Sequence, residues 1–564
     1  MKVVLCSLNS QYIHSSLAPW CLLAGVKQYG NSRLQVSVVE GTVNEDLAAV
    51  AERIIRLAPK CIGFCCYIWN IQRVHQLLPL IKTALPQTVV VLGGPEVGYC
   101  AYEVLTEHPL VDYVLTGEGE RSFAHLCNAL LSGESPMVAG VSGRQDGNVF
   151  SVPEAPLEEE PPSPYCDAYF AALNGRITYL ETSRGCPYAC AYCLSARCGK
   201  LKFFSVERAK REMLLLAKSG TKTVKLVDRT FNAHRERAKD LWRFIIENYG
   251  TNIPEGVCFH FEIAGDLLDD ESIDIIQTAP AGSMQFEVGI QSFHEPTLAY
   301  IRRKTDLQKL CHRVRRLLEK GNVHVHIDLI AGLPLEDFDT FGQSVNQAYA
   351  LGANMLQLGF LKLIHGSPMR EDPHRYPCSY HSMPPYEVTE TPALSEHDLA
   401  RLHQAEWAVD KLYNSGHFFG SLPYVLSVSG QTPFNLFLAF GEWANEKQGA
   451  PLSRVAHWFY EFALTQGADA VTLRDVMVCD WLSTVKGGQL PPFLQREDPR
   501  LSTFRKFLRK NSATKPLAGV ARGSALLYGE TQGVYVDYVN QDPVTGRYVL
   551  HPIDWEGEDD DASL

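Results

Sequence analysis

The chain has 564 residues, too long for one domain, and its length predicts about three to four. Hydrophobic residues make up 46% and charged residues 21%, as in globular proteins that bury several cores. The net charge of −12 argues against nucleic acid as a partner, and no apolar run reaches the length of a membrane span.

The cysteine content and the N-terminus predict a cytoplasmic protein. Several of the sixteen cysteines lie inside apolar runs, as Cys61, Cys65 and Cys258 do, which is typical of reduced thiols in a core. Met1 leads directly into a strand pattern, so no signal peptide is expected.

Residues 1 to 150 predict a doubly wound, Rossmann-like α/β domain. Short apolar runs alternate with amphipathic helical patterns, and continuously apolar strands indicate a buried parallel sheet. The expected strands are Val3–Leu8, Val36–Glu40, Cys61–Cys66, Val89–Gly94 and Tyr113–Gly117.

The loops after these strands are the expected binding edge, because ligands of open parallel sheets lie outside the carboxyl ends of the strands. No G-x-G-x-x-G opens the first helix, which argues against a dinucleotide. Glycines in two successive loops let the backbone approach a broad ligand, although a tight turn explains each of them equally well. The loop residues singled out are Ser7, Asn9, Tyr67, Trp69, Gly93, Gly94, Glu118 and Gly119.

Residues 151 to 170 are rich in proline and glutamate and predict an extended linker. From 171 to 372 the strand–helix alternation resumes with six strand patterns. Six repeats predict a partial, TIM-like (β/α)6 barrel whose chemistry lies at the carboxyl ends of the strands. The expected strands are Ile177–Glu181, Val224–Asp228, Val257–Ile263, Met284–Ile290, Val323–Ile330 and Leu356–Leu361.

The loop after the first barrel strand contains Cys186, Cys190 and Cys193 in the spacing C-x3-C-x2-C. Thiolates at this spacing can bind one 4Fe–4S cluster, and three ligands leave one iron open to a small molecule. The alternatives are structural cysteines or a zinc knuckle, although zinc sites ordinarily use paired C-x2-C elements.

Residues 373 to 564 predict a mostly helical C-terminal domain of unknown role. Ser395 to Asp398 offers a helix-capping start, and apolar helices are expected around Leu436–Phe440 and Val455–Phe462. Strand-like runs follow near the end, at Gly533–Val539 and Arg547–Leu550.

The cysteine loop, with Tyr192 before its last cysteine, resembles that of the radical S-adenosylmethionine (SAM) superfamily. With the preceding domain, the chain is similar to the cobalamin-dependent branch of that superfamily over residues 1 to about 370, and the C-terminal region resembles an uncharacterised domain found in some members. The resemblance implies a 4Fe–4S cluster on the three cysteines and SAM on the open iron. It places SAM near Tyr192, Asp228, Glu262, Gln291, Ser292 and Gly332.

For the first domain, the resemblance implies cobalamin at the loop residues singled out above. The D-x-H-x-x-G motif of many cobalamin domains is absent before residue 150, and His14 lacks that context. The lower face of cobalt is therefore expected to meet the loop Tyr67 to Asn70, or no protein ligand. Arg229 stands where the family often has a second acidic residue after Asp228.

The expected activity is reductive cleavage of SAM and methylation of an unactivated centre in a small molecule or natural product. No catalytic acid or base is assigned, because the difficult steps belong to the cofactors. The implied redox partner is an electron donor such as flavodoxin or ferredoxin. The alternatives are a cobalamin-dependent rearrangement, cyclisation or oxidation, a cobalamin-binding sensor, and, less favoured by the charge, a nucleic-acid-modifying enzyme.

Overall fold

The computed structural model describes residues 1–155, 159–197, 200–444, 449–511, 523–529 and 532–554. It divides into two compact units. Unit 1 contains Met1–Thr278, Ala299–Thr305 and Phe360–Pro392, and unit 2 contains Ala279–Leu298, Asp306–Gly359 and Ala393–Leu564. No helix among the described residues is long and apolar enough to cross a membrane.

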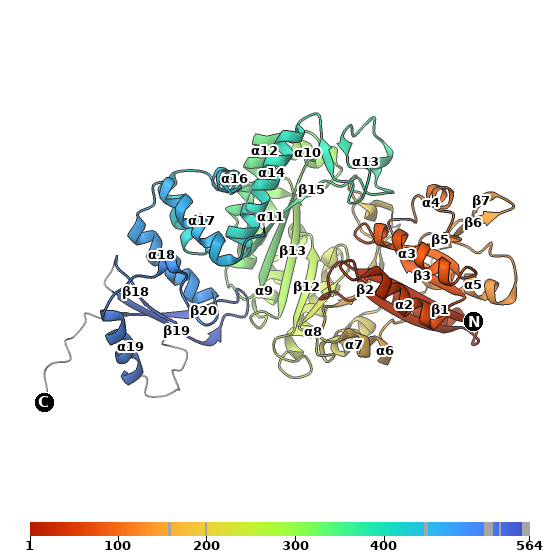
Figure 1. Ribbon diagram of the computed structural model, residues 1–564, viewed down its shortest axis with the longest axis horizontal. Helices are drawn as coiled ribbons and strands as arrows, with labels where there is room; N and C mark the ends of the chain where they lie inside the picture. The colour runs from red at the N-terminus through yellow and green to blue at the C-terminus, as the bar shows by residue number, and fades with distance from the viewer. Residues whose placement is uncertain (156–158, 198–199, 445–448, 512–522, 530–531, 555–564) are drawn as a thin grey trace. The chain divides into compact units, whose positions relative to one another are not determined.

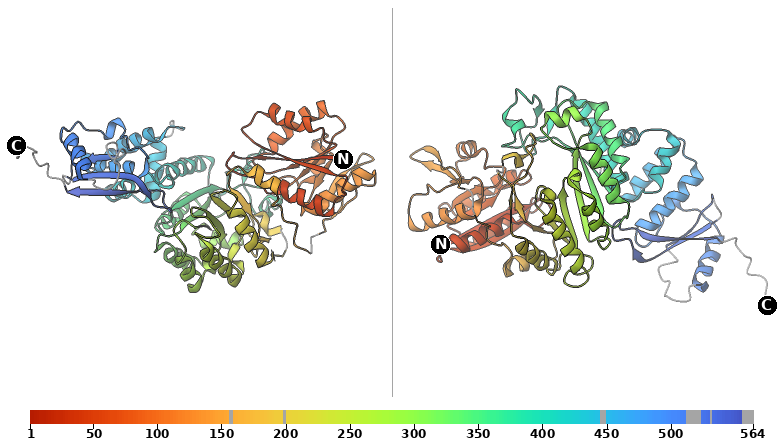
Figure 2. Two further views of the ribbon diagram at one scale, coloured as in Figure 1. Left: turned by 90° about the horizontal axis from the view of Figure 1, so that it is seen from below. Right: turned by 180° about the vertical axis from the view of Figure 1, so that it is seen from behind.

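The N-terminal part of unit 1 is the predicted doubly wound domain. Its seven strands have the order β2-β1-β3-β4-β5-β6-β7, with the first five parallel and the last two antiparallel. Figure 2 (left) shows helices on both faces of this sheet. The strands are β1 (Lys2–Asn9), β2 (Gln35–Thr42), β3 (Cys61–Cys65), β4 (Val89–Gly93), β5 (Tyr113–Leu115), β6 (Val141–Gln145) and β7 (Asn148–Ser151). The helices are α1 (Ala18–Tyr29), α2 (Leu47–Leu57), α3 (Ile71–Ala84), α4 (Ala101–Glu107) and α5 (Gly119–Ser132).

The core of this domain follows from the apolar strands and from one apolar stripe on each helix. Every residue of β3 is buried, as expected for a central strand covered on both faces. Asp46 caps α2 by accepting a hydrogen bond from the amide of Ala48, and Val50 and Ile54 of that helix are fully buried. All five strands predicted for this domain are confirmed.

The next elements of unit 1 begin the barrel. Helix α6 (Asp167–Leu173) precedes three strands, β8 (Thr178–Leu180), β11 (Thr223–Leu226) and β12 (Cys258–Ile263), which pair in parallel with β11 in the middle. Between them lie the short strands β9 (Ser183–Arg184) and β10 (Lys202–Phe203) and four helices, and a fifth helix follows β12. The helices are η1 (Leu194–Arg197), α7 (Val206–Ala217), η2 (Phe231–Ala233), α8 (Arg235–Asn248) and η3 (Gly265–Leu267).

The later barrel elements lie mainly in unit 2. Strands β13 (Met284–Gln291) and β14 (His324–Ala331) are parallel and alternate strictly between buried and half-buried residues. The apolar set, including Phe286, Val288, Val325 and Ile327, lies on one face of this pair. The remaining elements are α9 (Asp270–Gln277), α10 (Glu295–Tyr300), α11 (Leu307–Leu318), α12 (Phe338–Tyr349) and β15 (Met355–Phe360). Six parallel strands alternating with helices confirm the predicted (β/α)6 arrangement.

Residues 360–392, which follow β15, return to unit 1. They contain α13 (Pro368–Glu371) and the antiparallel pair β16 (Ser379–Tyr380) and β17 (Val388–Glu390). Tyr386 in this segment donates a hydrogen bond to the carboxylate of Glu96, in the loop after β4.

The C-terminal part of unit 2 is mostly helical, as predicted. A capping box between Ser395 and Asp398 starts α14. The helices are α14 (Glu396–Val409), η4 (Asp410–Asn414), α15 (Ser421–Ser429), α16 (Pro433–Trp443), α17 (Leu452–Thr465), α18 (Ala470–Thr484), η5 (Pro492–Leu494) and α19 (Arg500–Asn511). An antiparallel sheet follows, with β18 (Ser524–Leu526), β19 (Gln532–Gln541) and β20 (Tyr548–Asp554), drawn in dark blue in Figure 1.

Candidate functional site: the cysteine loop and the strand ends of the first domain

The three cysteines lie in a loop that is closed at its base by a short ladder. Strands β9 and β10 pair antiparallel, with Arg184 opposite Lys202 and Ser183 opposite Phe203. Gly185 follows β9 with a φ of 93°, a conformation that glycine adopts without strain. Cys186, Cys190 and Cys193 therefore lie in one loop whose two ends are joined by the β9–β10 ladder.

Two of the three thiols have a cation or a hydrogen-bond donor beside their sulfur. Cys190 is buried, and burial raises the pKa of its thiol above the ordinary value. The guanidinium of Arg303 lies 3.9 Å from the Cys190 sulfur, and the amide of Ser195 donates to the Cys193 sulfur over 3.4 Å. Hydrogen bonds and charges near the ligand sulfurs change the reduction potential of an iron–sulfur cluster.

None of the described cysteines forms a disulfide, so the three loop thiols are free to bind metal. Among the residues that the structure describes, no three His, Cys, Asp or Glu side chains lie close enough together to hold one metal ion. The donor chemistry of the loop, three free thiols with hydrogen-bond donors at two of them, fits a polynuclear iron–sulfur group.

Two segments from later in the chain hold the middle of the loop. The amide of Ala191 donates to the carbonyl of Ile301 over 2.8 Å, and the amide of Met369 donates to the Ala191 carbonyl over 3.0 Å. Both backbone groups of Ala191 are thus satisfied on opposite sides, which fixes the chain between Cys190 and Cys193.

Arg303 is a site residue that sequence reasoning missed. Besides Cys190, its guanidinium contacts the Tyr192 hydroxyl at 3.3 Å. Burial raises the pKa of Tyr192 well above its usual range, so the phenol stays neutral beside this cation. The run Arg302-Arg303-Lys304 is basic, but nothing in the sequence indicates which of the three turns toward the cysteines.

Asp228 follows β11 and is buried. Its carboxylate accepts hydrogen bonds from the Thr182 amide at 2.9 Å, the Thr182 hydroxyl at 2.7 Å and the Ser183 hydroxyl at 2.5 Å. Arg237 bonds the same segment through the Thr182 carbonyl at 3.1 Å. The direct partners of Asp228 are therefore the residues that lead into the cysteine loop. Its predicted contact with SAM stays a prediction.

The remaining predicted SAM residues lie on three strands or strand ends. Glu262 is half-buried on β12 of unit 1. In unit 2, Gln291 ends β13 at a register shift and has a φ of 75°, which is rare for a residue with a side chain. Strained residues and bulges gather at functional sites, which supports the prediction for Gln291. Gly332, just after β14, also has a positive φ of 86°.

Ser292 is fully buried and already bonded within unit 2. Its hydroxyl donates to Glu336 over 2.7 Å and accepts from the His294 amide. Ser344 donates to the same Glu336 oxygen, while the second carboxylate oxygen, Oε2, is buried without a hydrogen-bond partner among the described residues. Burial raises the pKa of Glu336 to about 7, against hydrogen bonds that lower it.

We expect Glu336 to make stability fall with rising pH. A carboxyl whose pKa is 4.5 when unfolded and about 7 when folded favours the folded state when protonated. That contribution, about 3 kcal/mol, is lost as the pH rises from 4.5 through 7. Glu336→Gln should therefore be stabilised relative to the unsubstituted protein more at pH 8 than at pH 5, measured by thermal unfolding. The exposed Asp339→Asn is the control, and an equal effect at both pH values would contradict the assignment.

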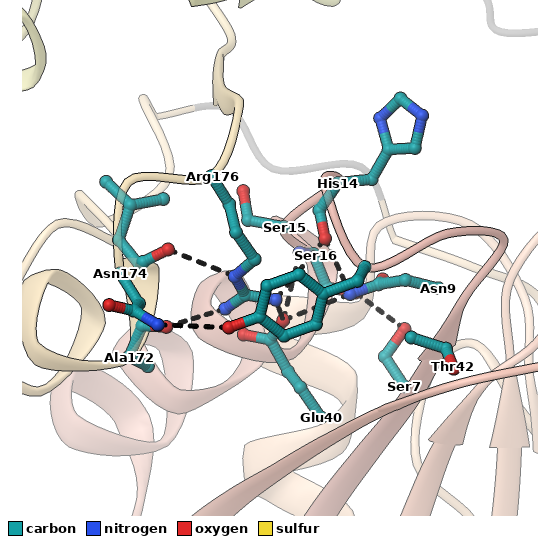
Figure 3. Close-up of polar contacts among 12 residues, drawn as sticks. Ser7, Asn9, His14, Ser15, Ser16, Glu40, Thr42, Ala172, Asn174 and Arg176 are labelled. Carbon is teal, nitrogen blue, oxygen red and sulfur yellow. Dashed lines mark hydrogen bonds and ion pairs between the residues drawn. The ribbon is translucent and has the colours of Figure 1, made fainter. Parts of the chain in front are cut away.

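In the first domain, Ser7 and Asn9 belong to a buried polar cluster around Glu40 (Figure 3). The Glu40 carboxylate accepts from Arg176 at 2.8 Å, from Asn9 at 3.2 Å and from the Trp20 indole at 3.0 Å. The Ser16 hydroxyl lies within hydrogen-bond distance of the Ser7 hydroxyl and the Asn9 amide oxygen. This cluster joins the ends of β1 and β2 to the chain just before β8. The cobalamin role predicted for Ser7 and Asn9 stays a prediction.

His14 lies beside this cluster and is engaged there. Its Nδ1 lies 2.6 Å from the Tyr179 hydroxyl, and the neighbouring Ser15 donates to the Ile177 carbonyl through its amide and its hydroxyl. His14 thus joins the loop after β1 to β8. This structural role agrees with its position outside any D-x-H-x-x-G motif.

The loop after β3 presents a flat aromatic pair. The rings of Tyr67 and Trp69 are stacked, with centroids 4.4 Å apart and planes 4° apart, and Trp69 is 48% exposed. The Trp69 indole donates to the Leu8 carbonyl, and Asn70 bonds the same carbonyl and that of Cys65. Asn70 therefore fixes the loop, and the exposed aromatic face fits a large, flat, partly apolar ligand.

Local packing explains some of the glycines in the loops after β4 and β5. Gly94 has a φ of 117°, and a Cβ there would lie 2.4 Å from the Cys66 carbonyl oxygen, so close packing between two strand ends already requires glycine. Gly93 has only ordinary contacts at that position, and a Cβ on Gly119 would press on Leu22. Glu118 occupies the N-cap position of α5 without a side-chain capping hydrogen bond, and it pairs with Arg184.

Three family models match successive parts of the chain. The "B12 binding domain" matches residues 5–127, the "Radical SAM superfamily" matches residues 180–348, and a "Protein of unknown function (DUF4080)" matches residues 374–525. The radical SAM match begins just before the cysteine loop and extends through α12. Residues 180–348 therefore match the radical SAM superfamily, and a match to the B12-binding domain precedes them in the chain.

Two of the most similar relatives are methyltransferases. The 2-(S-pantetheinyl)-carbapenam-3-carboxylate methyltransferase of Streptantibioticus cattleyicolor is 28% identical over 323 residues, which are 52% of this chain and 45% of that protein. The cobalamin-dependent radical SAM methyltransferase TokK of Streptomyces tokunonensis is 28% identical over 312 residues, with the same coverage. The chain thus spans about half the length of these relatives.

Solved structures share the fold. TsrM from Kitasatospora setae, solved with cobalamin and a [4Fe-4S] cluster, has a TM-score of 0.55 at 19% identity, over 65% of this chain and 73% of that one. The cobalamin-dependent enzyme OxsB, solved with aqua-cobalamin, has a TM-score of 0.58 at 14% identity, over 91% of this chain and 82% of that one.

Proposed function

We propose that this radical SAM protein binds a 4Fe–4S cluster, SAM and cobalamin, and methylates an unactivated centre of a small-molecule substrate. The observation that carries the proposal is the closed loop of three free cysteines, in the same compact unit as the B12-binding domain. The cofactors, when bound, would supply an electron at low potential and a transferable methyl group.

The chain's own residues would hold the cofactors and shield them. Cys186, Cys190 and Cys193 would bind three irons. The half-buried Arg303, whose guanidinium lies beside Cys190, offers a cation to the carboxylate of SAM at the fourth iron. Ala191, fixed from two sides, would keep the loop from opening to water. No acid or base of the chain is assigned to the central step.

In the first domain, the stacked Tyr67 and Trp69 offer a surface for one face of the corrin ring. No histidine is assigned beneath cobalt, because His14 bonds Tyr179. The free cysteines suit a reducing cytoplasm. We also propose an electron donor such as flavodoxin or ferredoxin as the redox partner, and a natural product as the substrate class.

The test is anaerobic reconstitution with iron, sulfide and hydroxocobalamin, followed by addition of SAM and a strong reductant. We expect iron-dependent absorbance, bound cobalamin and consumption of SAM, with S-adenosylhomocysteine among the products because a methyl group is transferred through cobalamin. Failure to bind a cluster would overturn the proposal.

A second candidate reaction is a radical cyclisation or oxidation without methyl transfer. It is favoured by similarity to the anaerobic magnesium-protoporphyrin IX monomethyl ester cyclase of Rubrivivax gelatinosus, which is 23% identical over 328 residues, 56% of this chain and 58% of that protein. Formation of 5′-deoxyadenosine without S-adenosylhomocysteine in the same assay would select this candidate.

A further inference from the structure

Arg184, two residues before the first cysteine, binds three carboxylates from two parts of unit 1. Its guanidinium makes two hydrogen bonds of 2.9 Å to Glu181, just after β8. It also lies 2.6 Å from Glu120 and 3.4 Å from Glu118, both at the N-terminus of α5. These contacts join the base of the cysteine loop directly to the B12-binding domain.

The Arg184 group is partly buried, and Glu120 is its most buried member. The exposed fraction is 18% for the Arg184 side chain and 4% for Glu120. Lys202, opposite Arg184 in the β9–β10 ladder, reaches Glu118 at 3.7 Å, so two cations serve three carboxylates. Without Arg184, the buried carboxylate of Glu120 would lose its nearest cation, which a protein interior tolerates poorly.

This ion group connects the two predicted cofactor-binding loops. On one side, Arg184 is followed by Gly185 and Cys186. On the other, Glu118 is the N-cap residue of α5, and Gly119 is its first residue. A forked guanidinium with two bonds to each of two carboxylates fixes distance and angle together, as a lysine cannot.

We propose that Arg184 is a positioning residue that couples cobalamin binding to the geometry of the cysteine loop. The proposal rests on the proposed function. Ordering the cysteine loop around a cluster orders Arg184, which places the Gly117–Glu120 turn for cobalamin. By reciprocity, bound cobalamin stabilises the cluster-binding form of the loop to the same extent.

The test is a binding cycle that needs no turnover. Hydroxocobalamin affinity is measured from its absorbance change, with the cluster-free protein and with the anaerobically reconstituted protein. We expect binding roughly tenfold tighter with the cluster present, within the range usual for coupled sites. In Arg184→Gln this ratio should fall to about one, and in Arg184→Lys it should be intermediate, because the charge remains and the fork is lost.

Arg211→Gln is the matched control, since Arg211 is exposed on α7 and has no part in the ion group. If Arg184→Gln does not fold, Arg184→Lys and Glu118→Gln decide by the same ratio. If the unsubstituted protein binds both cofactors but its cobalamin affinity is the same with and without the cluster, only the coupling by Arg184 is overturned. The same conclusion follows if Arg184→Gln keeps the full affinity ratio. An unsubstituted protein that binds no cluster or no cobalamin overturns the proposed function itself.

Discussion

Replacement of Cys190 by alanine is expected to remove the bound iron and with it all consumption of SAM. Cys190 is the buried cysteine of the three, and it is the one whose sulfur Arg303 contacts. A cluster held by two thiolates would lose a third of its protein ligands, and the half-buried Arg303 would lose its sulfur partner. We expect iron per chain to fall to background after reconstitution, with SAM turnover below detection.

Iron and acid-labile sulfide are measured chemically, and the reduced protein is examined by electron paramagnetic resonance. Cys166→Ala is the matched control. Cys166 lies just before α6, is half-buried, and makes no capping hydrogen bond, so its loss should leave iron content unchanged. Normal SAM turnover by Cys190→Ala would contradict cluster chemistry. If neither the unsubstituted protein nor Cys190→Ala consumes SAM, and both bind cobalamin equally well, a cobalamin-binding sensor would be favoured.

The fold was predictable from local patterns, except where strands were short or followed a tight turn. The apolar run Val89–Gly94 and the capping box at Ser395 and Asp398 both produce the expected elements. The antiparallel pair β6 and β7 was missed, although Asp146-Gly147 between them, both with positive φ, is a strong hairpin signal. Its flanking strands are too polar to be recognised by their hydrophobicity.

The candidate cluster ligands could be singled out from the sequence, because three cysteines within eight residues have a spacing that suits one cluster. The residues around them were not. Arg303 is 113 residues from Cys190, and Glu120 is 64 residues from Arg184. Only the folded chain shows such pairings. Asp228 was singled out as a polar residue at a strand end, but the sequence did not indicate its hydrogen-bond partners, Thr182 and Ser183.

Replacement of Asp228 by asparagine is expected to weaken the cysteine loop before it affects SAM. An asparagine side chain has one acceptor oxygen, and its NH2 group can only donate. That NH2 group would therefore face either the Thr182 amide or one of the two hydroxyls, all of which donate to the carboxylate in the unsubstituted protein. Hydrogen bonds to a charged group contribute about 1.5–3 kcal/mol each. Losing at least one of three should lower the unfolding temperature of the cluster-free protein and reduce iron per chain several-fold.

A double-mutant cycle with Ser183→Ala tests whether Asp228 acts through the loop. If both residues form one brace, the loss of iron in the double variant should be clearly less than the sum of the two single losses. SAM binding is then compared at matched cluster content, from the change that SAM causes in the resonance spectrum of the reduced cluster. An unchanged SAM affinity per cluster is the expected result. Full iron content with a lost SAM response would instead make Asp228 a direct SAM ligand, because a brace acts on the cluster first.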